Sequence, residues 1–285
     1  MTDKSVFRED EWRNNRHFLN PSKYKEYELH VSGLGFLNRI NFIKDHYEKF
    51  TPIDVLTPDI IKQLESKTTI HLIRKELSEE EKRLLEDERF KLVKTWGTLI
   101  LDVSKILDVS KFESSSDSLQ WETTYLKQLD STTAKNIRKG ESRLTFFRIT
   151  SEEDFKEYYE LFKESRKELK FKTASYPLYS SLLSNPYYAV FAVRDNESKK
   201  MVAGLGTIYN KNYLLEVNAA RNRECFFAND YLKWMLIKYC HEQNILYYDF
   251  AGCNPDPAPD SKDFNLRKFK AKWGGEFYYE YIFKR

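Results

Sequence analysis

Cysteine, glycine and long apolar runs are all scarce in this chain of 285 residues. The three cysteines, Cys225, Cys240 and Cys253, have no C-x-x-C spacing, which argues against a disulfide framework and a zinc ribbon. The longest apolar run, residues 187–193, is far shorter than the ~18 residues that a membrane-spanning helix needs. Residues 1–10 are polar, so we expect no signal peptide and a soluble, cytoplasmic protein.

An excess of charge of one sign is also missing. The chain has 47 Lys and Arg against 44 Asp and Glu, a net charge of +3, and 32% of its residues are charged. Such a mixed surface disfavours a dedicated duplex-DNA-binding protein. The five histidines show no ligand spacing, so we expect no metal site. Aromatic residues are abundant instead (20 Phe, 19 Tyr and 5 Trp), which is enough to help bury a large core.

The first part of the chain predicts an N-terminal α/β region at residues 1–112. The expected elements are a helix at 57–66, a strand at 68–75, a helix at 78–89 that begins with a Ser78–Glu81 capping box, and a strand at 98–103. Residues 113–143 predict a linker and a connecting helix over 119–139. Gly140 then stands where a left-handed residue ends a helix.

From residue 144 to 285 the pattern is more regular. The expected elements are strands at 145–149, 187–195, 200–209, 212–220, 247–250 and 276–283, with helices at 151–162, 229–243 and 264–272. This order predicts an α/β domain with a mixed, mostly antiparallel sheet flanked by helices. A helix between two neighbouring strands makes a crossover, beside which a ligand is expected to bind.

Two C-terminal segments resemble a known family. Residues 247–252 read Tyr-Tyr-Asp-Phe-Ala-Gly, and residues 266–275 read Leu-Arg-Lys-Phe-Lys-Ala-Lys-Trp-Gly-Gly. They resemble the signature of the Fem-type branch of the GNAT-fold acyltransferases, which includes the peptidoglycan bridge-forming aminoacyltransferases. Residues 98–103 resemble the family's Thr–x–x–Leu–Asp–Leu strand, and residues 135–139 its Arg–Asn–Ile–Arg–Lys helix. The similarity covers roughly residues 95–285.

The resemblance implies a GNAT fold, with an N-terminal region that is a degenerate half of the same kind. It also implies an N-acyltransferase that moves an acyl or aminoacyl group from an activated carrier to an amine, without a tightly bound cofactor. The amine would belong to a small molecule, a peptide or a cell-envelope precursor. Two departures stand out, because Ala251 replaces the first glycine of a Gly–Gly pair and Trp273 replaces a phenylalanine.

Acyl transfer needs a neutral amine, an aligned carbonyl and donors for the developing oxyanion. In this fold the carbonyl lies between two central strands that pull apart, and our candidates for them are the strand that holds residues 204–206 and the strand that holds residues 216–220. Glu216 is our candidate base, on a strand face shared with Asn218, and Asp249 ends a strand that faces the same crevice. Alternatively, Glu216 is an exposed carboxylate or part of a structural ion pair, and Asp249 forms a hydrogen-bonded turn. Gly204 and Gly206 interrupt a strand, either for close approach of the donor or for tight packing.

The donor and acceptor contacts are also predicted. Residues 221–229 contain no glycine to wrap a pyrophosphate, although Arg221, Arg223 and Asn229 could contact a donor at the helix N-terminus. This slightly favours aminoacyl-tRNA over acyl-CoA as the donor. The remaining candidates for binding substrate are Lys268, Phe269 and Lys270. The two lysines form a basic strip with Arg267 and Lys272, to which the connecting helix adds Lys135, Arg138 and Lys139. The family pattern gives Lys270 a phosphate contact.

Two other classes of function were weighed. A thiol mechanism would use Cys225 before a helix N-terminus, where the dipole lowers a thiol pKa. His241, its possible partner, stands at the far end of that helix, about 18 Å away, so we disfavour this mechanism. A non-catalytic module could instead bind RNA or a protein through the basic strip and exposed aromatic residues. No transmembrane segment is expected.

Overall fold

The chain packs into two compact units. The computed structural model describes residues 29–30, 37–40, 46–50, 56–62, 68–106, 118–168, 173, 175–209 and 212–285. The first unit comprises residues 1–98, 252–264 and 277–285, and the second comprises residues 99–251 and 265–276. This division differs from the predicted domains, 1–112, 113–143 and 144–285, because two C-terminal segments group with the N-terminal region.

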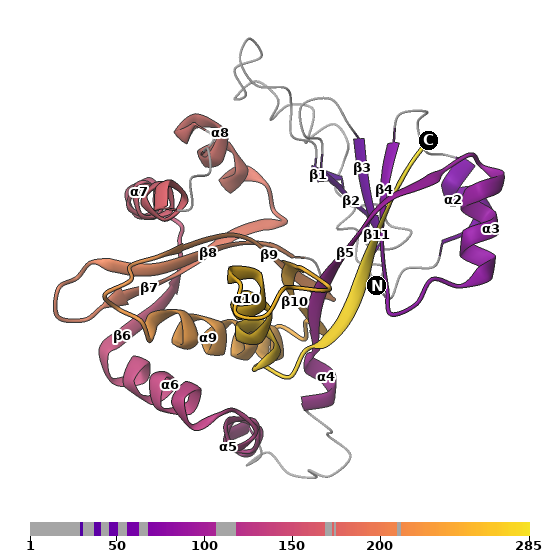
Figure 1. Ribbon diagram of the computed structural model, residues 1–285. Helices are drawn as coiled ribbons and strands as arrows, with labels where there is room; N and C mark the ends of the chain where they lie inside the picture. Colours follow the sequence, from indigo (N-terminus) through magenta and orange to yellow (C-terminus); the bar gives the residue numbers. More distant parts are fainter. Residues whose placement is uncertain are drawn as a thin grey trace, which may run out of the picture. The chain divides into compact units, whose positions relative to one another are not determined.

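The first unit is an α/β layer built on one sheet (Figure 1). Its strands lie in the order β1-β2-β3-β4-β11-β5. Their bounds are β1 (Leu29–His30), β2 (Leu37–Ile40), β3 (His46–Phe50), β4 (Thr68–Arg74), β11 (Glu276–Lys284) and β5 (Lys91–Asp102). Strand β5 continues into the second unit. Helices α2 (Pro58–Lys62) and α3 (Glu79–Asp87) accompany them. The core includes Leu56, Ile61, Ile70, Leu72, Leu85, Phe90 and Phe283.

The predicted elements of this unit are largely confirmed. The capping box of α3 is present, since the Ser78 hydroxyl accepts from the backbone N–H of Glu81 at 3.1 Å and the Glu81 carboxylate accepts from the N–H of Ser78 at 3.2 Å. Helix α2 begins at Pro58 as predicted. The rest of the predicted helix 57–66 beyond Lys62 lies outside the described residues. The same holds for residues 113–117 of the predicted linker at 113–118, whose last residue, Ser118, begins α5.

The position of β11 explains the altered division. Residues 279–284 pair antiparallel with residues 69–74 of β4, more than 190 positions away in the sequence. Sequence periodicity identifies a strand but carries no signal for a partner so far along the chain. The final strand was therefore predicted correctly as an element, and in the structure it groups with the N-terminal region.

The second unit holds a mixed sheet. Its strand order is β5-β10-β9-β8-β7-β6, with β6 (Leu144–Arg148), β7 (Tyr188–Asp195), β8 (Met201–Tyr209), β9 (Tyr213–Arg221) and β10 (Tyr247–Cys253). The pairs β6–β7, β7–β8 and β8–β9 are antiparallel, whereas β9 and β10 run parallel. Helix α9 (Ala228–Glu242) connects the parallel strands, as the predicted crossover requires.

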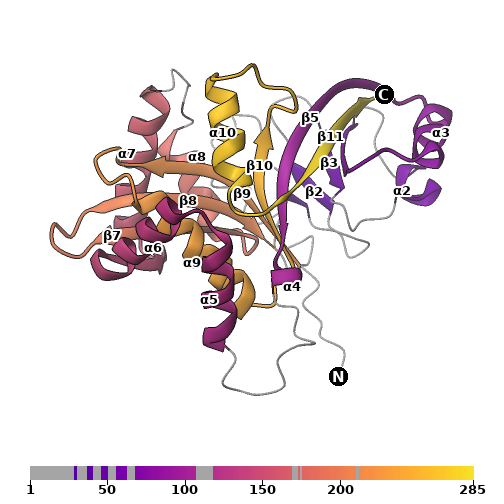
Figure 2. The same cartoon turned by 60° about the horizontal axis from the view of Figure 1, so that its bottom comes forward.

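Helices cover both faces of this sheet (Figures 1 and 2). Helix α7 (Glu152–Glu168) packs on one face, and α9 packs on the opposite face. The other helices are α4 (Val103–Ile106), α5 (Ser118–Gln128), α6 (Ser131–Arg143), α8 (Tyr176–Ser181), the short η3 (Leu182–Ser184) and α10 (Lys262–Ala271). The predicted apolar stripe of α7, Phe155, Tyr158, Tyr159 and Phe162, is buried.

The predicted helix over 119–139 is two helices, which corrects the role given to Gly140. Asp130 begins α6, because its carboxylate accepts hydrogen bonds from the backbone N–H of Thr133 at 2.9 Å and from the Thr133 hydroxyl at 2.7 Å. Gly140 therefore lies inside α6 rather than after its end. A Cβ atom there would lie 2.4 Å from the Tyr231 side chain, so the glycine permits close packing of α6 on α9.

Candidate functional site

The two parallel strands of the second unit pair over only a short length. The register joins Tyr213–Leu215 of β9 to Tyr247–Asp249 of β10, and residues 216–221 continue β9 without a partner on β10. We call this end of the pairing, after Leu215 and Asp249, the separation point. The strands predicted to pull apart were those of Gly204 and of Glu216, but these, β8 and β9, pair antiparallel along their length, and the strands that separate are β9 and β10.

A bulge lies next to the separation point. Gly206 of β8 pairs with Asn218, but Thr207 pairs with Glu216, so Val217 is an extra residue in β9. The bulge reverses the alternation of side chains, and Asn218 contacts residues of α7 and α8 while Glu216 contacts α9. The prediction that these two side chains share a face is therefore wrong, because a bulge leaves no clear mark in the residue pattern.

Glu216 is buried in a polar cluster on the α9 face. Lys233 of α9 forms an ion pair with its carboxylate, and the Tyr248 hydroxyl of β10 donates to the same oxygen at 2.6 Å. All three residues are at most 7% exposed. Burial lowers the pKa of Lys233, opposed by the charge of Glu216, and raises the pKa of Tyr248. Glu216 thus has the ion pair that the alternative interpretation described.

Lys233 was missed by the sequence reasoning, although a signal exists. Its neighbours in α9 are buried on nearly every side, including Leu232, Trp234, Leu236 and Ile237. A lysine inside such a helix cannot reach water easily and needs a buried partner of opposite charge. A buried lysine in α9 thus predicts a buried carboxylate on a neighbouring strand, and that carboxylate is Glu216.

Asp249 lies on the other face of the sheet from Glu216. It pairs with Leu215, and successive side chains point to opposite faces, so the predicted pair of catalytic carboxylates is not brought together. Asp249 is fully buried; one oxygen accepts from the Tyr213 hydroxyl at 2.6 Å and the other from the N–H of Ala251 at 2.8 Å. These contacts favour the alternative of a hydrogen-bonded turn.

The turn that Asp249 supports is strained at Ala251. This residue has φ 61°, in the left-handed region that favours glycine, at the position where the resembling family has glycine. Lys270 is buried, and its ammonium group donates to the Ala251 carbonyl at 3.0 Å. The residue predicted to contact a phosphate therefore contacts the end of β10 here.

Substitution of Ala251 measures this strain. Changing Ala251 to glycine removes the steric cost and adds chain entropy to the unfolded state, so we expect the free energy of unfolding to stay equal or rise by up to about 1 kcal/mol. Changing it to valine should lower that free energy by about 1–3 kcal/mol. Urea denaturation of the two variants measures both changes in the free energy of unfolding. A glycine variant clearly less stable than the wild type would contradict a left-handed backbone at Ala251.

Tyrosines fill the space beside the predicted donor-binding glycines. A Cβ on Gly204 would lie 2.6 Å from the Tyr158 ring, and one on Gly206 would lie 2.6 Å from the Tyr188 hydroxyl. Tyr158 also donates to the backbone carbonyl of Asn218 at 2.7 Å. Burial raises the pKa of Tyr158 and of Tyr188, which keeps both hydroxyls protonated at neutral pH. Of the two interpretations of these glycines, tight packing is the one that fits.

Two arginines precede the N-terminus of α9, and no side chain caps this end of the helix. Its N-cap, Phe227, makes no side-chain cap, and Asn229 is half-buried beside it. Arg221 and Arg223 are exposed, and Arg223 forms an ion pair with Glu168 at 2.7 Å. These positions remain compatible with a donor contact.

The thiol alternative finds no support at this helix end. Burial raises the pKa of Cys225, the opposite of the shift that a helix dipole would cause. His241, at the other end of α9, stacks on Trp121 with ring centroids 4.7 Å apart.

Two of the four segments that carry the family resemblance, residues 135–139 and 266–275, meet through the carboxylate of Asp230. Asp230 of α9 is buried, accepts from the Asn136 amide of α6 at 2.7 Å and pairs with Lys272 at 2.6 Å. Lys272 also lies over the Phe269 ring, 4.4 Å from its centroid, while Lys268 is exposed. The basic strip is therefore divided, because Lys270 and Lys272 hold the fold and Lys268 faces solvent.

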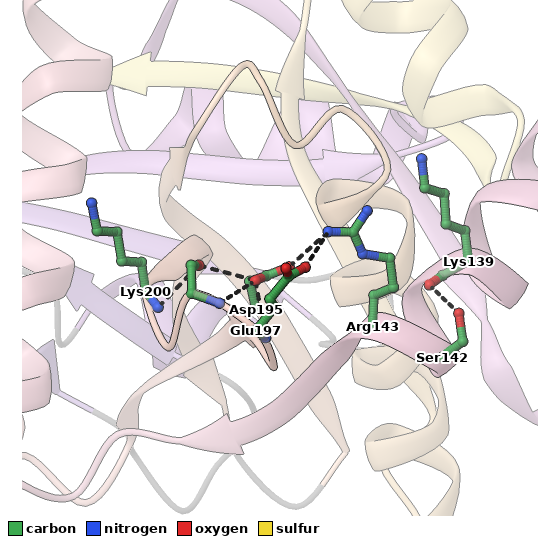
Figure 3. A network of polar contacts seen from close by, with 7 residues as sticks. Lys139, Ser142, Arg143, Asp195, Glu197 and Lys200 are labelled. Atoms are coloured by element: carbon green, nitrogen blue, oxygen red, sulfur yellow. Dashed lines mark hydrogen bonds and ion pairs between the residues drawn. The ribbon is translucent and has the colours of Figure 1, made fainter.

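A separate polar network ties the end of α6 to the turn between β7 and β8 (Figure 3). Arg143 pairs with Asp195 at 3.4 Å and with Glu197 at 3.8 Å. Lys139 lies one turn earlier on the same helix, over the Phe227 ring at 4.5 Å. Of the cations predicted on this helix, Lys139 is thus engaged by an aromatic ring of the same chain.

Neither a metal cluster nor a membrane span is found in the part of the chain that the structure describes. No group of three or more His, Cys, Asp or Glu side chains there could hold a metal ion. Among the same residues, no helix is both long enough and apolar enough to cross a bilayer.

Comparison with known sequences gives a short match. No protein-family model matches the chain. A lipid II:glycine glycyltransferase of Staphylococcus epidermidis is 34% identical over 77 residues, which is 25% of this chain and 18% of that protein. The corresponding enzyme of Staphylococcus aureus is 32% identical over the same length. The match thus covers less than a fifth of these relatives' length.

Comparison with solved structures covers nearly the whole chain. FemX has a TM-score of 0.60 at 14% identity, over 91% of this chain and 87% of that chain. The C-terminal domain of a putative lysylphosphatidylglycerol synthetase from Agrobacterium fabrum has a TM-score of 0.59 at 13% identity, over 91% and 84%. At these identities the structures establish the fold. The fold and the local sequence match together confirm the predicted resemblance to the Fem-type branch of the GNAT-fold acyltransferases.

Proposed function

We propose that the protein is an N-acyltransferase that transfers an acyl or aminoacyl group from an activated carrier to an amine at the separation point of β9 and β10. The observation that carries this proposal is the loss of pairing after Leu215 and Asp249 in a fold shared with FemX. Backbone groups that leave a ladder are free to bind a ligand, and acyl transfer needs such donors for the developing oxyanion.

The residues around the separation point divide between support and contact. Asp249 and Lys270 fix the turn at the end of β10, and the Glu216 cluster fixes the α9 face. Asn218, half-buried beyond the bulge, and the exposed Lys268 are the side chains left to contact substrate. Catalysis would then depend on alignment and backbone donors more than on a free carboxylate.

Aminoacyl-tRNA is the donor that the geometry supports slightly better. A pyrophosphate site at a helix N-terminus normally uses a glycine-rich turn, and residues 221–229 have no glycine. Phe227 at the N-cap also provides no hydrogen-bonding side chain. The acceptor, by analogy with the glycyltransferases that match locally, would be an amine of a cell-envelope precursor such as lipid II.

Parallel donor assays test this proposal. We expect the purified protein to modify lipid II with glycyl-tRNA and to bind charged tRNA more tightly than uncharged tRNA. Micromolar binding of acetyl-CoA, with no response to aminoacylation of the tRNA, would reverse the donor assignment and leave acyl transfer in place. Binding of tRNA regardless of charging, with no transfer from either donor, would favour a non-catalytic RNA-binding module.

A further inference from the structure

A lysine that the proposed reaction does not use lies buried beside the separation point. Lys233 is 7% exposed, and its ammonium group forms an ion pair with Glu216, the first residue of β9 beyond the paired region. The Tyr248 hydroxyl reaches the same carboxylate oxygen at 2.6 Å. The cluster therefore joins three elements, β9, β10 and α9, where two of them stop pairing.

The cluster is not required simply to fill space. Its surroundings are apolar, and Lys233 lies over the rings of Tyr248 and Phe250 at 6.0 and 5.8 Å. A buried ion pair among such residues can often be replaced by apolar side chains without loss of stability. A polar cluster in this place fixes one arrangement of the three elements, because its ion pair and hydrogen bond form only when β9, β10 and α9 hold these relative positions.

We propose that Lys233 is a positioning residue that holds Glu216 and Tyr248 so that β9 and β10 separate after Leu215. The proposal rests on the proposed function, because it explains how the opening for the donor carbonyl is kept in place. Lys233 acts through Glu216 and does not touch substrate. Glu216, paired with an ammonium group, is correspondingly unsuited to act as a free base.

Three variants test the proposal: Lys233→Met, Glu216→Gln and the double variant. The single Lys233→Met leaves a buried carboxylate without a cation, so its Tm should fall by about 5–10 °C. The double variant removes both charges and should recover most of that loss. If Lys233 has a positioning role, kcat of the double variant stays about tenfold or more below wild type, because misalignment costs rate even in a stable fold.

Hydrogen exchange separates this proposal from the proposed function. The backbone amides of residues 213–215 and 247–249 should exchange at least tenfold faster in the double variant, because the cluster no longer holds the end of the pairing. Wild-type exchange together with kcat within twofold of wild type would overturn the proposal. If the wild-type protein transfers nothing, the proposed function fails, and the exchange rates alone decide the role of Lys233.

Discussion

Replacing Asp249 with alanine is expected to lower the free energy of unfolding by about 3–5 kcal/mol. The Tyr213 hydroxyl and the Ala251 N–H both donate to this carboxylate, at 2.6 and 2.8 Å, in a fully buried place. Removal of the acceptor leaves two donors without partners where water does not reach them. Urea denaturation followed by tryptophan fluorescence measures the loss.

A matched variant separates structure from catalysis at this position. Asp249→Asn keeps one acceptor oxygen, so we expect about half of the stability loss. Under conditions in which both proteins are folded, the asparagine variant should retain measurable transfer. If Asp249 were the base, Asp249→Asn would abolish transfer as completely as Asp249→Ala, and a negligible stability loss in the alanine variant would contradict the hydrogen-bonded turn.

Replacing Gly140 with alanine is expected to destabilise the protein by about 2–3 kcal/mol, although alanine is the better helix former. The added Cβ would lie 2.4 Å from Cβ and Cγ of Tyr231, which are held against the helix and cannot move as the end of a flexible side chain could. The helices α6 and α9 would have to separate. Thermal and urea denaturation of the single variant measure the loss.

The control for this prediction reverses its sign. In a Tyr231→Gly background both obstructing atoms are gone, and Gly140→Ala should then raise the free energy of unfolding by up to about 1 kcal/mol through helix propensity. The coupling between the two positions would be several kcal/mol, far outside the range of independent sites. A destabilising effect of equal size in both backgrounds would contradict direct contact as the cause.

The fold could be predicted well wherever local signals decide it. The capping box at Ser78 and the apolar stripe of α7 follow from spacing alone, and both are present. The break after Gln128 was missed, because Asp130 as an N-cap was read as part of one longer helix. Gly140 was therefore predicted to end that helix, whereas in the structure it lies inside α6 and leaves room for the Tyr231 side chain.

The candidate site was predicted in part. Glu216, Asn218 and Asp249 do lie around the separation point, yet the bulge at Val217 and the alternation along the strands place them on different faces. Register and bulges depend on cross-strand pairing, which one sequence does not reveal. Lys233 could not be recognised from strand-end patterns, because it is a charge inside a helix whose neighbouring residues are buried.

The return of β11 to β4 has a consequence for biosynthesis. A ribosome completes residues 68–74 long before it reaches residues 279–284. The edge of β4 that pairs with β11 therefore stays unpaired through most of translation. During that interval the nascent N-terminal sheet exposes unpaired backbone groups that invite association with other chains. Premature termination before residue 279 would therefore release a chain in which the edge of β4 has lost its β11 partner.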